Sequence, residues 1–122
     1  MKQFNIELKD EIGVLSRISK LIGEVGVNIE SISGETHRGG DAIVRVIPDD
    51  EDKMRKLLVQ NKLDFEEKDV VVVTVENKPG KLGETIGRIS DHGISIFSIL
   101  TVEKSPERTT FALSVDTNAE RI

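Results

Sequence analysis

The sequence predicts an α+β fold made of two tandem copies of one βαβ-type module. A comparison of the chain with itself at an offset of 67 residues aligns several glycine and apolar positions. The aligned pairs are Gly13 with Gly80, Leu15 with Leu82, Ile22 with Ile89, Gly26 with Gly93, Ile29 with Ile96, Ser31 with Ser98 and Ile32 with Ile99. Within each copy the apolar spacing changes from that of a strand to that of a helix and back. The two observations together predict the same order of elements twice.

The first half of the first copy reads as strand, helix and strand. Phe4, Ile6 and Leu8 alternate with polar residues, which is typical of a strand with one buried face. Residues 12–25 are expected to be helical, because their apolar residues recur on one stripe. These residues are Leu15, Ile18, Ile22 and Val25. Gly26 is expected to end this helix as a left-handed C-cap, and a second strand follows from residue 27.

The second half of the first copy completes a four-stranded module. A hairpin at residues 37–40 is expected to lead into a strand over 42–47. Pro48, Asp49 and Asp50 then start a second helix, whose stripe is Met54, Leu57 and Leu58. With a short strand at 62–66 the order is βαββαβ, the ferredoxin-like sandwich with two helices on one face of an antiparallel sheet. Residues 67–69 contain no Pro, Gly or Ser, so they predict a close, rigid join between the copies.

The second copy repeats this plan but stops early. Its expected elements are a strand over 70–75, a helix over 81–91, a strand over 94–102, a hairpin at 105–108 and a strand over 109–115. Residues 116–122 match only the first turn of the second helix. We therefore expect modules at 1–68 and 69–122, the second lacking most of its last helix and its last strand. Either the chain is truncated or disordered beyond Ile122, or another polypeptide completes the module.

Composition narrows the function classes. The 122 residues are 37% apolar and 32% charged, with four Phe and no Trp or Tyr, so the core must be built from Ile, Val and Leu. A net charge of −5 argues against nucleic acid as a partner. No apolar stretch approaches the ~18 residues of a membrane span. The absence of cysteine excludes disulfides and thiolate chemistry, and we expect a cytoplasmic location.

Catalytic and metal-binding patterns are missing from the sequence. His37 and His92 are expected to be surface residues, and the acidic run at 49–52 suits a helix N-terminus. No nucleophile stands in a recognisable local motif, and no glycine-rich loop has the spacing of a phosphate cradle. We therefore expect no enzyme activity, no metal and no cofactor.

The turns between the first strand and first helix of each copy carry the chemistry that is present. They read Asp10-Glu11-Ile12-Gly13-Val14-Leu15 and Asn77-Lys78-Pro79-Gly80-Lys81-Leu82. A glycine lets the backbone bring open helix-start N–H groups close to a carboxylate. The preceding Asp10 or Asn77 can accept a hydrogen bond from an ammonium. The pair of features suits an α-amino acid, although turn chemistry alone also explains these residues.

These residues resemble the ACT family, which has an acidic or amide residue followed by Pro-Gly-x-Leu and later an Asn-Ile pair that opens the second strand. The second copy matches at Asn77, Pro79, Gly80, Leu82, Gly93 and Ile96, and the first at Asp10, Gly13, Leu15, Gly26, Asn28 and Ile29. Ile12 replaces the proline in the first copy, and Ser95 replaces the asparagine in the second. The first copy is also similar to the regulatory subunit of acetolactate synthase, an ACT protein that confers feedback inhibition by a branched-chain amino acid.

The resemblance implies a non-catalytic protein that binds an amino acid or similar metabolite and thereby changes conformation or assembly. ACT modules resemble one another in pairing through the second strand and first helix, which implies two sites. One joins Asn77, Pro79, Gly80 and Leu82 to Asn28 and Ile29, and the other joins Asp10, Gly13 and Leu15 to Ser95 and Ile96. We expect the Asn77 site to bind more tightly, because proline pre-sets its turn and asparagine both donates and accepts.

Two partner classes follow from the same reasoning. An uncovered edge of the strand at 70–75 predicts a homodimer or larger assembly. We expect no output domain, and we therefore expect the protein to act on a metabolic enzyme or regulator encoded elsewhere. The alternatives are an assembly module without a metabolite, and a regulatory subunit of an amino-acid biosynthetic enzyme.

Overall fold

The computed structural model describes residues 1–37 and 40–116, which contain six strands and three helices. In chain order they are β1 (Lys2–Lys9), α1 (Val14–Glu24), β2 (Ile29–His37), β3 (Asp41–Pro48), α2 (Glu51–Gln60), β4 (Asp64–Glu76), α3 (Lys81–Asp91), β5 (Ile96–Lys104) and β6 (Arg108–Val115). The fold is therefore α+β, as predicted. The chain divides into two compact units, Met1–Glu67 and Lys68–Ile122.

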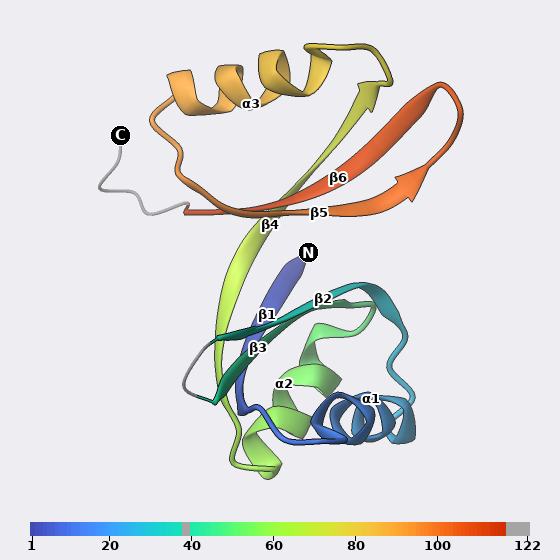
Figure 1. The fold of residues 1–122 in the computed structure, drawn as a ribbon, viewed down its shortest axis with the longest axis vertical. Helices are drawn as coiled ribbons and strands as arrows, with labels where there is room; N and C mark the ends of the chain where they lie inside the picture. The colour runs from blue at the N-terminus through green and yellow to red at the C-terminus, as the bar shows by residue number, and fades with distance from the viewer. Residues whose placement is uncertain (38–39, 117–122) are drawn as a thin grey trace. The chain divides into compact units, whose positions relative to one another are not determined.

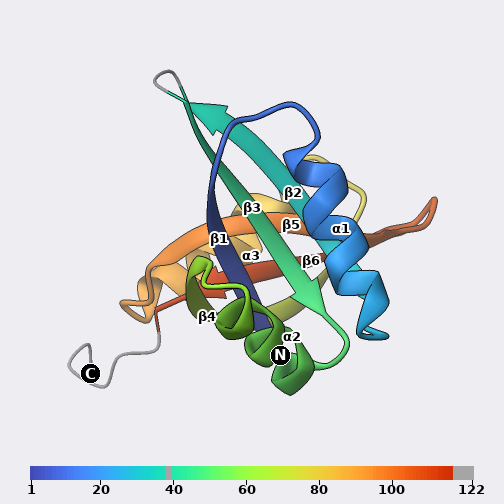
Figure 2. The ribbon, with the colours of Figure 1, turned by 90° about the horizontal axis from the view of Figure 1, so that it is seen from below.

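The first unit has the strand order β2-β3-β1-β4, with β3 antiparallel to both β1 and β2. Both helices lie on one face of these strands (Figures 1 and 2). The apolar stripes predicted for the strand and helices meet in a core in which Phe4, Ile22 and Met54 are fully buried. The strand pattern and the stripe of α2 therefore predicted the buried faces correctly. The stripe of α1 was right only in part, because Ile18 and Ile22 are buried whereas Leu15 and Val25 are 49% and 37% exposed.

Glycines in the left-handed region set both ends of α1. Gly13 precedes the helix with φ 85°, and Gly26 follows it with φ 76°. The helix was predicted to begin at Ile12, but it begins at Val14, because Gly13 has a backbone conformation that a right-handed helix cannot contain. Gly26 ends the helix as predicted.

The acidic run before α2 acts as a helix start. Asp50 is the N-cap residue, and its carboxylate accepts a hydrogen bond from the backbone N–H of Lys53 at 3.1 Å. Asp52 pairs with Arg55 at 2.9 Å. The prediction that these residues cap a helix is confirmed. The hairpin predicted at 37–40 joins β2 to β3, and two of its residues lie outside the described part.

The second unit has the strand order β4-β6-β5, and α3 lies on one face of these strands (Figure 1). The helix has the bounds predicted for it. Gly80 repeats the left-handed conformation of Gly13, with φ 87°. The backbone N–H of Asp116 bonds to the Ser95 carbonyl at 3.0 Å, as that of Asp49 does to Asn28. The partial second helix predicted here is, apart from its first residue, outside the described residues.

Strand β4 departs from the prediction. Two strands separated by a link at 67–69 were expected, but a single strand runs from Asp64 to Glu76. The charged residues of the expected link have tertiary partners, since Glu67 binds Arg55 and Lys68 lies 4.4 Å from the centroid of the Phe97 ring. These partners let charged residues continue the strand. Among the described residues, no helix is long and apolar enough to cross a bilayer.

Candidate functional site

The start of α1 presents open backbone donors. The N–H of Val14 is used locally, on the Glu11 carbonyl at 3.1 Å, and the N–H of Arg17 makes the first helical bond, to Gly13 at 2.9 Å. Between them, the backbone N–H groups of Leu15 and Ser16 have no partner in residues 1–37 and 40–116. No side chain caps this helix. Two adjacent donors at a helix N-terminus therefore remain for an anionic group.

The start of α3 has the same backbone geometry. Lys81 donates to the Lys78 carbonyl at 3.2 Å, and Glu84 donates to Gly80 at 3.1 Å. The N–H groups of Leu82 and Gly83 again have no partner in the described part of the chain. The repeat therefore extends from sequence to individual hydrogen bonds.

A hollow of about 430 Å³ adjoins the start of α1. Its lining comes from the turn, the first helical residues and the facing parts of β2 and β3, namely Asp10, Glu11, Gly13, Val14, Leu15, Ser16, Gly34, Glu35, Thr36, Ala42 and Val44. The carboxylate of Asp10 has no partner in the described residues. The hollow thus combines two open N–H donors, a carboxylate and an apolar wall. That combination suits a zwitterion with a side chain.

The turn at Asn77 is occupied by the protein itself. The Asn77 side chain donates to the carbonyls of Ser105 at 2.8 Å and Pro106 at 3.3 Å, and it accepts a hydrogen bond from the Thr109 hydroxyl at 2.6 Å. The hollow nearest to this residue is lined by residues 76–78 and 106–108, without Gly80 or Leu82. In this structure Asn77 ties the turn to the β5–β6 hairpin.

The site residues predicted at the start of the second strand of each copy lie at equivalent positions in the two units. Asn28 donates both its backbone N–H and its side-chain amide to Asp49, at 2.9 and 3.2 Å. Ser95 begins the corresponding segment of the second unit. Ile29 and Ile96 are the first residues of β2 and β5. The expected sites join residues of different units, so their pairing stays a prediction.

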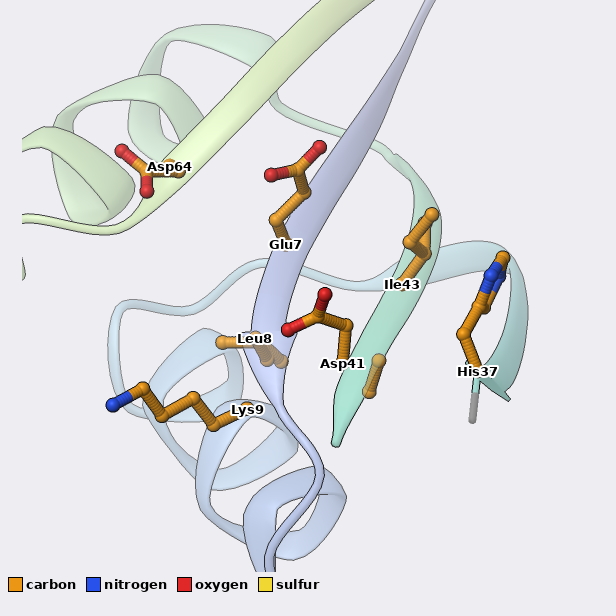
Figure 3. Close-up of a pocket in the computed structure, with 8 residues that line it drawn as sticks. Glu7, Leu8, Lys9, His37, Asp41, Ile43 and Asp64 are labelled. Atoms are coloured by element: carbon orange, nitrogen blue, oxygen red, sulfur yellow. The ribbon is translucent and has the colours of Figure 1, made fainter. Parts of the chain in front are cut away.

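A second hollow lies on the strands of the first unit. Figure 3 shows Glu7, Asp41, Asp64 and His37 around it, carried by four different strands. In the part of the chain that is described, no three His, Cys, Asp or Glu side chains are placed to hold a metal ion. His37 is exposed, and His92 bonds through Nδ1 to the Arg88 carbonyl at 2.7 Å within its own helix end. We assign no chemistry to this surface.

Sequence reasoning missed part of the hollow beside α1. Ser16 follows Leu15 directly, so its open N–H could have been predicted from its position in the first turn of the helix. Gly34, Thr36 and Val44 had no such signal, because the strand register that places β2 and β3 beside the turn is a tertiary feature.

Residues 2–58 match the ACT domain. The matched segment contains the turn at Asp10 and Gly13, the start of β2 and most of α2. No curated protein matches the chain.

Solved structures with a similar fold cover nearly the whole chain. Protein BT0572 from Bacteroides thetaiotaomicron is 24% identical, with a TM-score of 0.80 over 98% of this chain and 81% of that one. The regulatory subunit of aspartate kinase from Thermus thermophilus is 14% identical, with a TM-score of 0.66 over 93% and 82% of the two chains. At these identities the likeness shows the fold.

Proposed function

We propose that this chain is a regulatory protein with two tandem ACT modules, and that it binds an amino acid at the start of α1. The observation that carries the proposal is the hollow beside the open N–H groups of Leu15 and Ser16, within the segment that matches the ACT domain. The α-carboxylate of the ligand accepts hydrogen bonds from these two groups. Its ammonium pairs with the Asp10 carboxylate.

The hydrogen bonds made by Asp10 and Asn77, which begin the two turns, support the first unit as the principal site. Asp10 has no protein partner among the described residues, whereas the Asn77 amide is already used by the hairpin. A ligand at the second turn would have to replace those hydrogen bonds, which lowers its net gain. We therefore propose the reverse of the ranking expected from sequence. Asn28, Ile29, Ser95 and Ile96 stay candidate ligand-binding residues, together with Pro79, Gly80 and Leu82.

Regulation follows if the ligand binds one conformational or assembly state more tightly than another. The fold shared with a regulatory subunit of aspartate kinase supports this role, with a metabolic enzyme or regulator as the partner. We propose a cytoplasmic protein without catalytic activity of its own.

The second candidate function is assembly without a metabolite. Within the described residues, β2 and β5 are each hydrogen-bonded to a strand on one side only. Ile32 on β2 and Ile99 on β5 are about two-fifths exposed, at 42% and 40%. Exposed apolar edge strands favour pairing with a second copy, and we propose a homodimer on this ground.

A thermal-shift screen against the twenty amino acids separates the two functions. Saturable stabilisation by one or a few of them supports binding. Leu15→Pro removes one open N–H in the first helical turn, where proline is tolerated, and it should abolish the shift. Leu82→Pro is the matched control in the second unit and should keep it. No shift with any amino acid, together with a stable dimer by light scattering, would favour the assembly function.

A further inference from the structure

Gly34 lines the hollow without any backbone reason to be glycine. It lies in the middle of β2, it is not among the residues with positive φ, and no turn or bulge occurs at its position. Glycine in a strand interior weakens the strand, because it has no side chain to pack. Its presence here therefore needs another explanation.

Close packing does not explain this glycine either. A Cβ placed on Gly34 would have its nearest neighbours at 3.9 and 4.0 Å, which are ordinary contacts. Gly34 pairs with Val44, whose side chain belongs to the core on the helix side of the sheet. Since directly opposed residues share a face, a side chain at position 34 would project on that side, where the hollow lies.

The second unit shows that this position accepts a larger residue. Thr101 is the equivalent of Gly34 at the offset of 67 residues, and it pairs with Phe111 as Gly34 pairs with Val44. The same fold thus carries a β-branched side chain at the equivalent paired position, just before a register shift between Thr101 and Glu103 that β2 does not have after Gly34. Only the first unit, with the open hollow, has glycine there.

The charge of the lining restricts what could fill the space. Asp10, Glu11 and Glu35 are acidic, and the lining contains no Lys, Arg or His. The Glu35 carboxylate is paired with Arg45 at 2.8 Å, whereas those of Asp10 and Glu11 have no partner in the described part of the chain. In the proposed function the ligand's ammonium pairs with the Asp10 carboxylate, which leaves that of Glu11 without a cation. A second ligand carboxylate would add like-charge repulsion.

We infer that Gly34 keeps the hollow open for the side chain of the ligand, and that the ligand is an amino acid with an extended, non-acidic side chain. This inference rests on the proposed function, because it takes the start of α1 as the binding site. Gly34 is then a specificity-determining position. Replacing it fills the space that the ligand side chain occupies.

Calorimetric titration with two pairs of amino acids tests the inference. Methionine and alanine differ in side-chain length, and glutamine and glutamate differ in charge at nearly equal size. The unmodified protein should bind methionine or glutamine at least about tenfold more tightly than alanine or glutamate, as expected when a buried side chain adds ~1.4 kcal/mol. Gly34→Thr should weaken the longer ligand about tenfold and leave alanine within about twofold.

Two controls make the result decisive. The melting temperature of ligand-free Gly34→Thr should equal or exceed that of the unmodified protein, since the second unit tolerates threonine here. Ser33→Thr adds a methyl group on the opposite face of the same strand and should leave every affinity unchanged. A melting temperature lowered by Gly34→Thr would show that glycine serves the fold and would overturn the inference.

The remaining outcomes separate the two proposals. Unchanged affinity for the longer ligand in Gly34→Thr, or tighter binding of glutamate than of glutamine, overturns the inference and leaves the proposed function standing. Absence of binding by all four amino acids and by the rest of the twenty overturns both.

Discussion

Gly13, before α1, and Gly23, within it, differ in what they contribute. Gly13 has φ 85° before the helix, whereas Gly23 lies inside it with helical backbone, and a Cβ would meet no atom within 4 Å at either position. Any difference between their substitutions therefore comes from the backbone. The pair isolates the cost of the left-handed turn on which the open N–H groups depend.

Gly13→Ala should lower the free energy of unfolding by about 1–2 kcal/mol, the cost of the left-handed region for a residue with Cβ. Gly23→Ala should raise it by about 0.5–1 kcal/mol, because alanine is the better helix former. Urea denaturation of both variants measures the difference. Equal effects of the two substitutions would show that Gly13 is not held in the left-handed region.

Asn77 should act as a structural residue of the second unit. Asn77→Ala leaves the buried Thr109 hydroxyl without its acceptor and should cost about 1–2 kcal/mol of unfolding free energy. Thr109→Val removes the stranded hydroxyl, so the double variant should cost less than the sum of the single ones. Additive costs in urea denaturation would contradict the coupling.

Some residues of the site could be predicted from sequence, whereas the role of others could not. Asp10, Gly13 and Leu15 lie within six residues of one another, so local turn and helix-start chemistry found them. The role of Asn77 depends on Ser105 and Thr109, which lie about thirty residues further along the chain. No local pattern could show that these partners already occupy its amide.

At the scale of elements, α2 is held to β4 by one ion pair. Arg55 binds Glu67 through two hydrogen bonds, of 2.8 and 2.6 Å. The guanidinium holds the pKa of the Glu67 carboxyl below its usual value of 4.5. The stabilisation is therefore fully present above that value and is lost as the pH falls through the lowered pKa of the folded state.

Glu67→Gln should therefore lower stability at neutral pH and much less at about pH 3. The free energy of unfolding of both proteins, measured by urea denaturation at the two pH values, gives the comparison. If the difference in free energy of unfolding between the two proteins is as large at about pH 3 as at neutral pH, the charge of Glu67 does not stabilise the fold. Glu30→Gln, at an exposed position of β2, provides a control for the general effect of removing a charge.

Elements with a strong local signal were predicted well, and those that depend on distant partners were not. Helix α3 has the predicted bounds, because an apolar stripe is framed by Gly80 and Gly93. Strand β4 was wrongly predicted as two strands, because the charged residues Glu67 and Lys68 are typical of a solvated link. Their partners Arg55 and Phe97 lie far from them in the sequence. The start of α1 was predicted two residues too early, since the left-handed φ of Gly13 is a property of the folded turn that no apolar pattern shows.

At the scale of the whole molecule, one backbone plan is used in two ways. Each unit has a left-handed glycine and two open N–H groups at the start of its first helix. In the first unit the neighbouring carboxylate is unpartnered within the described residues and the strand opposite has Gly34. In the second unit Asn77 is bound by the hairpin and threonine replaces that glycine. The self-comparison of the sequence thus predicted the glycine turn at both helix starts but not the different surroundings of Asp10 and Asn77.

The most direct test is to follow the backbone amide resonances by NMR during titration with the amino acid that stabilises the protein most. We predict that the largest and saturable shifts occur at the N–H groups of Leu15 and Ser16, because these donate to the ligand carboxylate. The resonances of Leu82 and Gly83 should change little and serve as the internal reference. Shifts confined to Leu82 and Gly83, or the absence of a localised change at either helix start, would contradict the account.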